Sequence, residues 1–506
     1  MRISMTGGQR GKIPYKWIVV MVVVFGSFMS ILDQTVVNNA LPRLQEAFSV
    51  DLSSLQWILT AYALTQGVVT PTTAYFANRL NPKRFYVIAL VLFTMGSALC
   101  GLAWSLPALI VFRVVQAIGG ATLFPLAITL LFYEFPPDER GLAVGVMSVS
   151  ALMAPAIGPT LGGYFVTYAD WRLIFYINVP VGIIAIVMAL LLLRERPSEG
   201  RTRFDLLGFM LAATGLAAVL YALSNAPTYG WDSPSVLVAL IGGLCLLALL
   251  VFVELRVANR GGQPLVDLRL FANGPFLTSN IANALITFSF FGSIILLPVY
   301  LQDLRGLSAF QAGLFTVPLA ITAVLAAIAG GRVVDRFGPR TVLLPGLVLM
   351  SLSTWQLAQV QLSTSYVWLL LIFAIRGLGL GFLLQPLTVS ALSGVPRAQY
   401  TQASSLTTVT RFTFTSLGIA VLATLVQSRA SVHIAALAHQ LRTISPSAVA
   451  LIRAQGLNMA VQDAFWFSLL AFLLAFIAIA FIRVQKPVPQ QQADERAALV
   501  VSNPVE

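Results

Sequence analysis

Asp33 is the one acidic residue of nineteen that falls well inside a long apolar stretch of the sequence. At about 1.5 Å per helical residue, it lies roughly 24 Å from Trp17 and about 12 Å from Leu41, within a bilayer core. A charge there costs at least about 2.5–3.5 kcal/mol unless it is paired or hydrated. A carboxyl group that alternates between desolvated and paired environments is suited to carrying a proton, and we predict this role for Asp33. The alternative is a fixed Asp33–arginine pair that only holds helices together.

Three arginines, Arg113, Arg376 and Arg411, also fall inside apolar stretches. Arg113 keeps its proton under ordinary conditions, so it can act as a fixed counter-charge that pairs with an acid in one conformation and releases it in another. Snorkelling of Arg113 to the membrane surface is the competing interpretation. Arg376 could line a cavity, whereas Arg411 could equally hydrogen-bond to backbone carbonyls near a helix end.

The elements that position these residues are membrane spans. The 506-residue chain is 58% hydrophobic and 10% charged, with a mean hydropathy of +0.85, whereas a soluble protein carries about 25% charged residues. The net charge of +12 comes from basic residues that form no dense cluster, so it does not indicate nucleic acid binding. We predict an all-α polytopic protein with fourteen spans, near 16–40, 54–76, 85–104, 107–131, 141–165, 172–193, 206–224, 235–255, 275–301, 309–331, 341–360, 366–392, 403–427 and 464–482.

Lysine and arginine predict the orientation of these spans. The termini and even-numbered loops hold 22 of the 31 basic residues, the odd-numbered loops hold six, and three lie within spans. Basic loops stay in the cytoplasm, so we predict a multi-pass protein of the cell inner membrane with both termini inside. The first apolar run has no cleavage site of the usual kind and is predicted to stay as a span.

These spans suggest a domain organisation with an internal repeat. We expect a cytoplasmic tail (1–15), a six-helix bundle (16–195), connectors with two extra spans (196–270), a second six-helix bundle (271–485) with an extracytoplasmic loop at 428–463, and a cytoplasmic tail (486–506). The loops AYFANRLNPK at 74–83 and GRVVDRFGPR at 331–340 share their pattern 257 positions apart. Such repeats build transporters in which two bundles rock around a site at the bilayer midplane. The loops supply a predicted cytoplasmic gate of Arg79, Lys83, Asp335, Arg336 and Arg340, although their arginines could serve only to fix topology.

Five successive motifs resemble one transporter group. These are LDQTVVNNALP at 32–42, QWILTAYAL at 56–64, LIVFRVVQAIG at 109–119, the set Gly145, Gly158, Pro159, Gly162 and Gly163, and WRLIFYINVPVG at 171–182. They are similar to the fourteen-span drug:proton antiporter branch of the major facilitator superfamily (EmrB/QacA-like pumps). The resemblance implies two six-helix bundles plus two extra central helices, proton coupling through Asp33 and Arg113, and a hinge or seal at the span 5 glycines. Asn78, Asn81, Ala117 and Ala154 depart from the pattern of that group.

The substrate cavity is expected to be apolar and aromatic with a few polar groups. By their positions in spans, the candidates for its lining are Gln34, Asn38, Gln66, Asn283, Phe291 and Gln385.

Other energy sources and chemistries have no signal in the sequence. It contains no GxxxxGK[ST] loop for ATP, and its two cysteines and two histidines show no metal-ligand spacing. We therefore predict no enzyme activity, no cofactor and no metal, with the proton gradient as the energy source. The predicted function is export of amphipathic small molecules in exchange for protons, with the bilayer, protons and substrates as partners. A dedicated exporter of a metabolite, lipid or siderophore, and a non-transporting membrane sensor, stay open as alternatives. A periplasmic adaptor protein is compatible with the sequence, which is silent about it.

Overall fold

The computed structural model describes residues 14–50, 52–196, 204–260, 262, 264–439 and 446–482, and no strand occurs within these ranges. The N-terminal half comprises α1 (Tyr15–Phe48), α2 (Leu52–Val69), α3 (Thr73–Leu80), α4 (Pro82–Gly101), α5 (Leu106–Glu134), α6 (Arg140–Tyr168), α7 (Leu173–Tyr176) and α8 (Asn178–Leu192). The extra pair is α9 (Leu206–Tyr229) and α10 (Pro234–Asn259). The C-terminal half comprises α11 (Gly274–Ile294), α12 (Leu296–Pro298), α13 (Ala309–Leu314), α14 (Thr316–Phe337), α15 (Arg340–Leu357), α16 (Tyr366–Ser393), α17 (Tyr400–His439) and α18 (Pro446–Ala480).

The helices fall where the apolar runs predict them, and the all-helical fold is confirmed. Within the described residues, eleven helices are long and apolar enough to cross a membrane. The predicted spans 54–76, 141–165 and 341–360 are not among the eleven, but they coincide with α2 to α3, with α6 and with α15. The count of fourteen spans therefore stays a prediction.

Proline and a capping side chain set the start of several helices. Asn81 precedes Pro82 at the start of α4, and its side chain accepts a hydrogen bond from the backbone N–H of Arg84 at 2.9 Å. Ser105 caps α5 in the same way, and Asn273 caps α11. Proline fits the first turn of a helix because the N–H it lacks would have no intrahelical partner there.

The internal repeat recurs in the backbone. Asn81 ends α3 with φ 66° and ψ 153°, and Gly338, 257 positions later, ends α14 with φ 88° and ψ 166°. Each is followed by a proline at the start of the next helix, Pro82 in α4 and Pro339 just before α15. A positive φ is strained for a residue with a Cβ, and glycine is the residue that adopts it most easily. The second copy of the repeat has glycine at this position, whereas the first copy has Asn81 and bears the strain.

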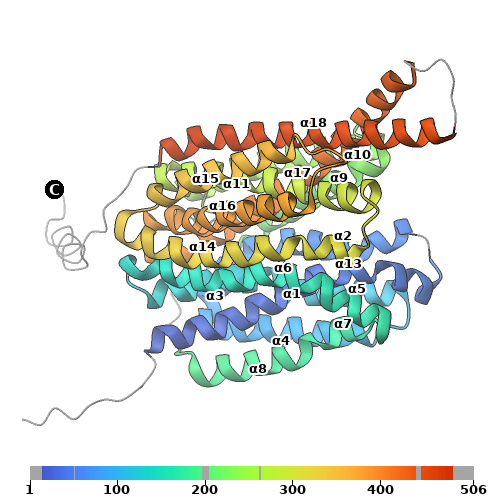
Figure 1. Cartoon of the computed structure of the whole chain (residues 1–506). Helices are drawn as coiled ribbons and strands as arrows, with labels where there is room; N and C mark the ends of the chain where they lie inside the picture. Colours follow the sequence, from blue (N-terminus) through green and yellow to red (C-terminus); the bar gives the residue numbers. More distant parts are fainter. Residues whose placement is uncertain are drawn as a thin grey trace, which may run out of the picture.

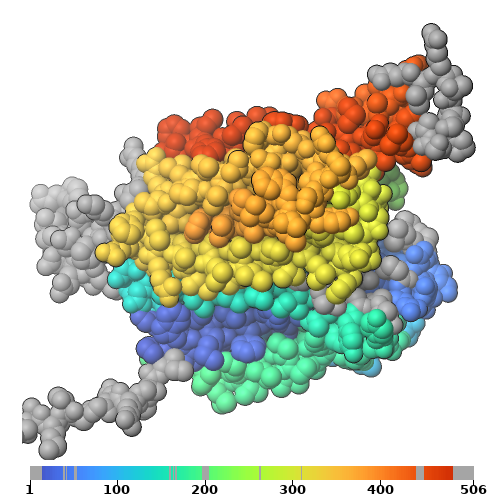
Figure 2. All heavy atoms as spheres, viewed as in Figure 1, coloured from blue at the N-terminus to red at the C-terminus, as the bar shows by residue number. Residues whose placement is uncertain are grey.

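The two halves form two layers that meet along a seam (Figure 1). The start of α1 and the end of α18 lie at the same end of the bundle. At that end, atoms of the two halves are in contact on the face drawn in Figure 2. The ring of Phe132 on α5 packs edge-on against Tyr400 on α17, with centroids 5.4 Å apart. The structure is therefore closed at the end that carries the basic loops.

The segment 428–463, expected as an extracytoplasmic loop, is helical over residues 428–439 and 446–463. α17 continues to His439 and α18 already begins at Pro446, and both extend past the rest of the bundle opposite the termini (Figure 1). No glycine or proline interrupts the chain between 428 and 439, so nothing in the sequence ends α17 earlier. Asp463 joins the two extensions by contacts to His433 at 2.8 Å and Arg429 at 3.5 Å. The predicted tails fall almost entirely outside the described residues.

Candidate functional site

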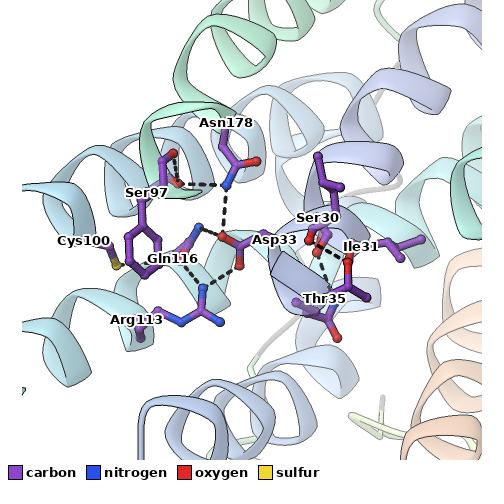
Figure 3. A network of polar contacts seen from close by, with 12 residues as sticks. Ser30, Ile31, Asp33, Thr35, Ser97, Cys100, Arg113, Gln116 and Asn178 are labelled. Atoms are coloured by element: carbon purple, nitrogen blue, oxygen red, sulfur yellow. Dashed lines mark hydrogen bonds and ion pairs between the residues drawn. The ribbon is translucent and has the colours of Figure 1, made fainter. Parts of the chain in front are cut away.

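Four helices of the N-terminal half converge on the Asp33 carboxylate (Figure 3). Oδ2 accepts a hydrogen bond from Arg113 Nη1 at 2.5 Å, and Oδ1 accepts from Gln116 Nε2 at 2.8 Å and Asn178 Nδ2 at 3.0 Å. Asp33 lies on α1, Arg113 and Gln116 on α5, and Asn178 on α8. Asn178 also donates to Ser97 Oγ of α4 at 3.1 Å. Every contact to the carboxylate is a donor, which is the arrangement that an ionised acid requires.

The site excludes water in this conformation. Asp33 is 0% exposed and Arg113 is 1% exposed. The Arg113 guanidinium lies over the ring of Tyr62, 4.1 Å from its centroid, and also donates to Gln116 Oε1 at 2.7 Å. A buried ion pair is stable only when its charges are compensated and hydrogen-bonded, as they are here. The structure thus brings together the predicted pair Asp33 and Arg113.

The neutral partners of this pair had no role assigned from sequence. Gln116 and Asn178 occur in the motifs at 109–119 and 171–182, but only the structure places their amides on the carboxylate. Gln116 follows Arg113 by three residues, so both lie on one face of α5. That spacing was the one sequence signal for Gln116.

The C-terminal half repeats the arginine without the acid. Arg376 on α16 donates to Thr354 Oγ1 on α15 at 2.8 Å and to Ser293 Oγ on α11. In the predicted repeat, α11 and α16 correspond to α1 and α5, so Arg376 contacts the helix that matches α1, but through the hydroxyl of Ser293 and not through an acid. Arg376 is 2% exposed and has no acidic partner among the described residues. Among the described residues, a buried acid–arginine pair inside the spans is found in the N-terminal half alone.

Of the predicted gate residues, Asp335 is the one whose hydrogen bonds join the two halves. Its carboxylate accepts from the backbone N–H groups of Gly141 at 2.6 Å and Leu142 at 2.8 Å, at the start of α6. An acid at a helix N-terminus satisfies free N–H groups and the helix dipole.

The other gate residues bond within their own half. Arg79 donates to the hydroxyl of Tyr75, Lys83 to the carbonyl of Leu190, and Arg340 to the carbonyl of Ala480. Arg336 lies over the neighbouring ring of Phe337. Within the described part of the chain, no ion pair links these five residues to one another.

The span 5 glycines allow α6 to approach its neighbours closely. A Cβ at Gly145 would lie 2.5 Å from the carbonyl oxygen of Ala327 on α14, in the other half. A Cβ at Gly158 would overlap the side chain of Thr35 on α1. Gly162 is buried, and Pro159 and Gly163 lie on α6 with side-chain positions outside the described set. Gly145 thus lies at the seam, whereas Gly158 packs inside the N-terminal half.

Of the predicted cavity residues, the structure places one at a cavity, and the shared role of the set stays a prediction. Asn283 lines a small cavity between the halves. Gln34 donates to the carbonyl of Ser30 on its own helix, and Phe291 packs edge-on against Phe290. Gln66 and Gln385 are buried in α2 and α16, and the side chain of Asn38 lies outside the described residues.

Two further acids are buried, Asp267 beside Arg269 and Glu254 near the end of α10. Glu254 is 1% exposed and has no hydrogen-bond partner for either carboxylate oxygen within the described structure. Gly208 on α9 lets Glu254 and Asp205 approach, since a Cβ there would lie 2.5 Å from Glu254 Oε1 and 2.8 Å from Asp205 Oδ2. From sequence, Glu254 counts only as a residue near a span end.

Comparisons with known proteins agree with this fold. The sequence matches the Major Facilitator Superfamily over residues 23–205 and 204–419. It is 34% identical to the multidrug resistance protein B homolog of Mycobacterium tuberculosis (strain ATCC 25618 / H37Rv), over 80% of this chain and 75% of that protein. It is 30% identical to the multidrug export protein EmrB of Escherichia coli (strain K12), over 87% of this chain and 86% of that protein. The crystal structure of the human organic anion transporter MFSD10 (TETRAN) matches with a TM-score of 0.63 at 16% identity, covering 91% of this chain and 100% of that one, which shows the fold alone. The chain belongs to the Major Facilitator Superfamily, and its relatives there include multidrug efflux transporters.

Proposed function

We propose that the chain is a proton-coupled antiporter that exports amphipathic small molecules across the cell inner membrane by alternating access. The observation that carries the proposal is the Asp33 carboxylate, fully buried among apolar helices and held by three donors from two other helices. A carboxylate that only held helices together could be replaced by a neutral polar side chain, which costs less to bury in a membrane span than a charge does.

Protonation of Asp33 would force its surroundings to rearrange. A protonated carboxyl group carries an O–H that needs an acceptor, whereas Arg113 Nη1, Gln116 Nε2 and Asn178 Nδ2 all present donors. Arg113 keeps its charge, so the proton removes the counter-charge that stabilises the guanidinium. Since α1, α5 and α8 contribute these groups, arrival of a proton changes how the helices of this bundle pack.

The contacts at the end of the bundle that carries the basic loops are those expected of a state closed to the cytoplasm in an alternating-access cycle. Asp335 caps α6 across the seam, and Gly145 allows α6 and α14 to touch there. With both termini in the cytoplasm, this closed end faces the cytoplasm and the exit path lies on the other side. The proton gradient supplies the energy, with roughly 2.3 kcal/mol per charge for each 100 mV of membrane potential. A periplasmic adaptor would be a partner only in a cell with a second membrane.

The test is substrate-induced proton movement in proteoliposomes that contain the full chain. We would compare the native protein with Asp33→Asn and Asp33→Glu under an imposed pH gradient, using a panel of lipophilic cations, anions and neutral compounds. The expected result is that one compound class drives proton flux in the native protein, that Asp33→Glu keeps part of it, and that Asp33→Asn loses it.

Controls separate loss of function from loss of folding. Glu195→Gln removes an exposed acid in a loop and should transport as the native protein does. Each variant should elute as a single species and bind the compound in detergent. Transport by Asp33→Asn with unchanged proton flux would overturn the proton role of Asp33. Binding without any flux in the native protein would favour the membrane sensor instead.

A further inference from the structure

A small cavity with a largely polar lining lies between the halves. Its volume is about 10 Å³, and it is lined by Phe124, Asn283, Thr388, Ser404, Thr407, Thr408 and Arg411. Arg411 is eleven residues from Tyr400, the start of α17, or about 16 Å along the helix in a bilayer core about 30 Å thick. Phe124 comes from α5 in the N-terminal half, and the other residues come from α11, α16 and α17. This is where transporters built from two bundles bind substrate.

Arg411 brings a charge into this cavity without a counter-charge. Its guanidinium makes no hydrogen bond or ion pair within the described residues, and its nearest aromatic contact is the ring of Phe124, 4.3 Å from the centroid. The other two arginines inside spans do make polar contacts: Arg113 pairs with Asp33, although its Nε has no partner, and Arg376 donates to two hydroxyl groups. Arginine stays charged and offers five N–H donors, so Arg411 brings into the cavity a positive charge that the lining residues do not neutralise.

Two further polar groups of the cavity lack partners. Asn283 is 4% exposed and its Nδ2 has no hydrogen-bond partner in the described structure, and the same holds for the hydroxyl of Thr407. The hydroxyls of Thr388 and Thr408 instead donate to carbonyls of their own helices. The lining residues include no carboxylate. A guanidinium and an amide N–H₂ therefore line a space whose own acceptors are neutral oxygens, with no carboxylate among the lining residues.

We propose that this cavity binds an anionic group of the substrate, a carboxylate, sulfonate or phosphate, through Arg411, with Asn283 as a second donor. The proposal rests on the transport function proposed above and names its substrate class as amphipathic anions. An anion supplies acceptors on every side, and bidentate contact with a guanidinium is among the strongest polar contacts in proteins. The present cavity holds no more than one water molecule. Because Phe124 closes it from the other half, the anion enters when the halves separate.

The primary test is equilibrium binding to the purified full chain, with three probes of the same chain length. These are decanesulfonate, decyltrimethylammonium and decanol, each radiolabelled and kept below its micelle concentration. The native protein should prefer the sulfonate at least tenfold over the cation. Arg411→Gln should lose that preference, Arg411→Lys should keep part of it, and Asn283→Ala should weaken sulfonate binding severalfold.

The matched control is Arg453→Gln, which removes one positive charge from an exposed position on α18 and should bind as the native protein does. Single-species elution of every variant excludes misfolding, and Arg411→Lys keeps the test valid if Arg411→Gln is unstable. A native protein that prefers the cation or binds no sulfonate overturns the proposal, as does unchanged sulfonate binding in Arg411→Gln. Weakening by Arg453→Gln equal to that by Arg411→Gln would also contradict it.

The failure of this proposal is distinguishable from failure of the antiport proposal. Asp33→Asn should abolish proton-driven accumulation of the sulfonate in proteoliposomes while leaving its equilibrium binding within about twofold of native, because Asp33 and Arg411 lie in different helix groups. If the sulfonate binds but the proton flux does not depend on Asp33, proton coupling through Asp33 is contradicted and the anion site is not. If cations drive proton flux and Arg411→Gln leaves that flux unchanged, the anion site is contradicted and the antiport proposal is not.

Discussion

The carboxylate of Asp335 accepts a hydrogen bond from the backbone N–H of Gly141 at 2.6 Å, and this bond joins the two halves of the transporter. It forms where α6 begins, so one side chain both caps a helix and closes the expected cytoplasmic end of the seam. In the proposed alternating-access cycle such a contact would break when the halves separate, so it would favour the closed state at this end.

Asp335→Ala should favour opening at this end. Hydrogen bonds to a charged group contribute about 1.5–3 kcal/mol each, so loss of two should change the equilibrium at least about tenfold. We would measure the labelling rate of a cysteine placed at Val334, which is buried near this seam, in a chain without other cysteines. Labelling should be several times faster in Asp335→Ala. An equal rate with and without Asp335 would contradict its role as a closing contact.

Gly145→Ala should impair closure of the same seam. The new Cβ would lie 2.5 Å from the carbonyl oxygen of Ala327, and backbone cannot yield as a side chain can. We expect destabilisation of about 1–3 kcal/mol and loss of most transport. Gly242→Ala on α10 is the matched control, since a Cβ there has no atom within 4 Å, and it should be neutral or stabilising by up to about 1 kcal/mol. Thermal melting and transport rates, measured side by side, test both variants.

Asn178→Leu should weaken coupling. Asn178 donates to both Asp33 and Ser97, and leucine retains its approximate volume without a donor. We expect initial rates of proton-driven transport to fall about tenfold, since one hydrogen bond to a charged group contributes about 1.5–3 kcal/mol. Substrate binding should stay within about twofold of native. A rate equal to that of the Arg453→Gln control would show that this amide has no part in coupling.

Substitutions at Asn81 should separate backbone strain from helix capping. Asn81→Gly removes strain of about 1–3 kcal/mol at φ 66° but also removes the cap of α4, which contributes about 1 kcal/mol. The net stability should be equal to or greater than native. Asn81→Ala keeps the strain and loses the cap, so its melting temperature should fall. A less stable glycine variant would show that the side chain contributes more than its cap.

Glu195→Gln should leave stability at pH 7 unchanged. Hydrogen bonds from Arg84 lower the pKa of Glu195 below its usual value. A lowered pKa stabilises the fold above the unfolded value, and this stabilisation is lost as the pH falls through the folded one. Both side chains are more than half exposed, however, so screening by water leaves little effect. A resolvable fall in melting temperature at pH 7 would contradict this expectation.

Apolar run length predicts most of this fold because lipid forces every spanning backbone into helices. It also predicts Asp33 and Arg113, since isolated charges in apolar runs stand out. It does not predict which neutral side chains complete the site. Gln116 and Asn178 have the same polarity as many other residues in spans, and their role depends on how each helix is rotated about its axis.

The same limit applies to Arg411 and to the extensions of α17 and α18. From sequence, Arg411 could hydrogen-bond to carbonyls near a helix end, but it lies in mid-helix over Phe124 with no such contact. Residues 428–439 are polar enough to indicate a loop, yet they contain no helix breaker and stay helical. The polarity of a segment predicts where the chain leaves the membrane. The end of a helix is predicted instead by glycine, proline and capping residues.

Arg113 and Phe124 are both carried by α5, eleven residues apart. Eleven residues complete three helical turns, so the two side chains project from the same face with about 16 Å between them. One part of α5 therefore contacts Asp33, the proposed proton carrier, and another part forms one wall of the cavity around Arg411. In the proposed cycle a tilt of α5 would move both side chains and so connect the two sites, and Pro125, which leaves the carbonyl of Ala121 without its helical partner, is the place where this helix can bend.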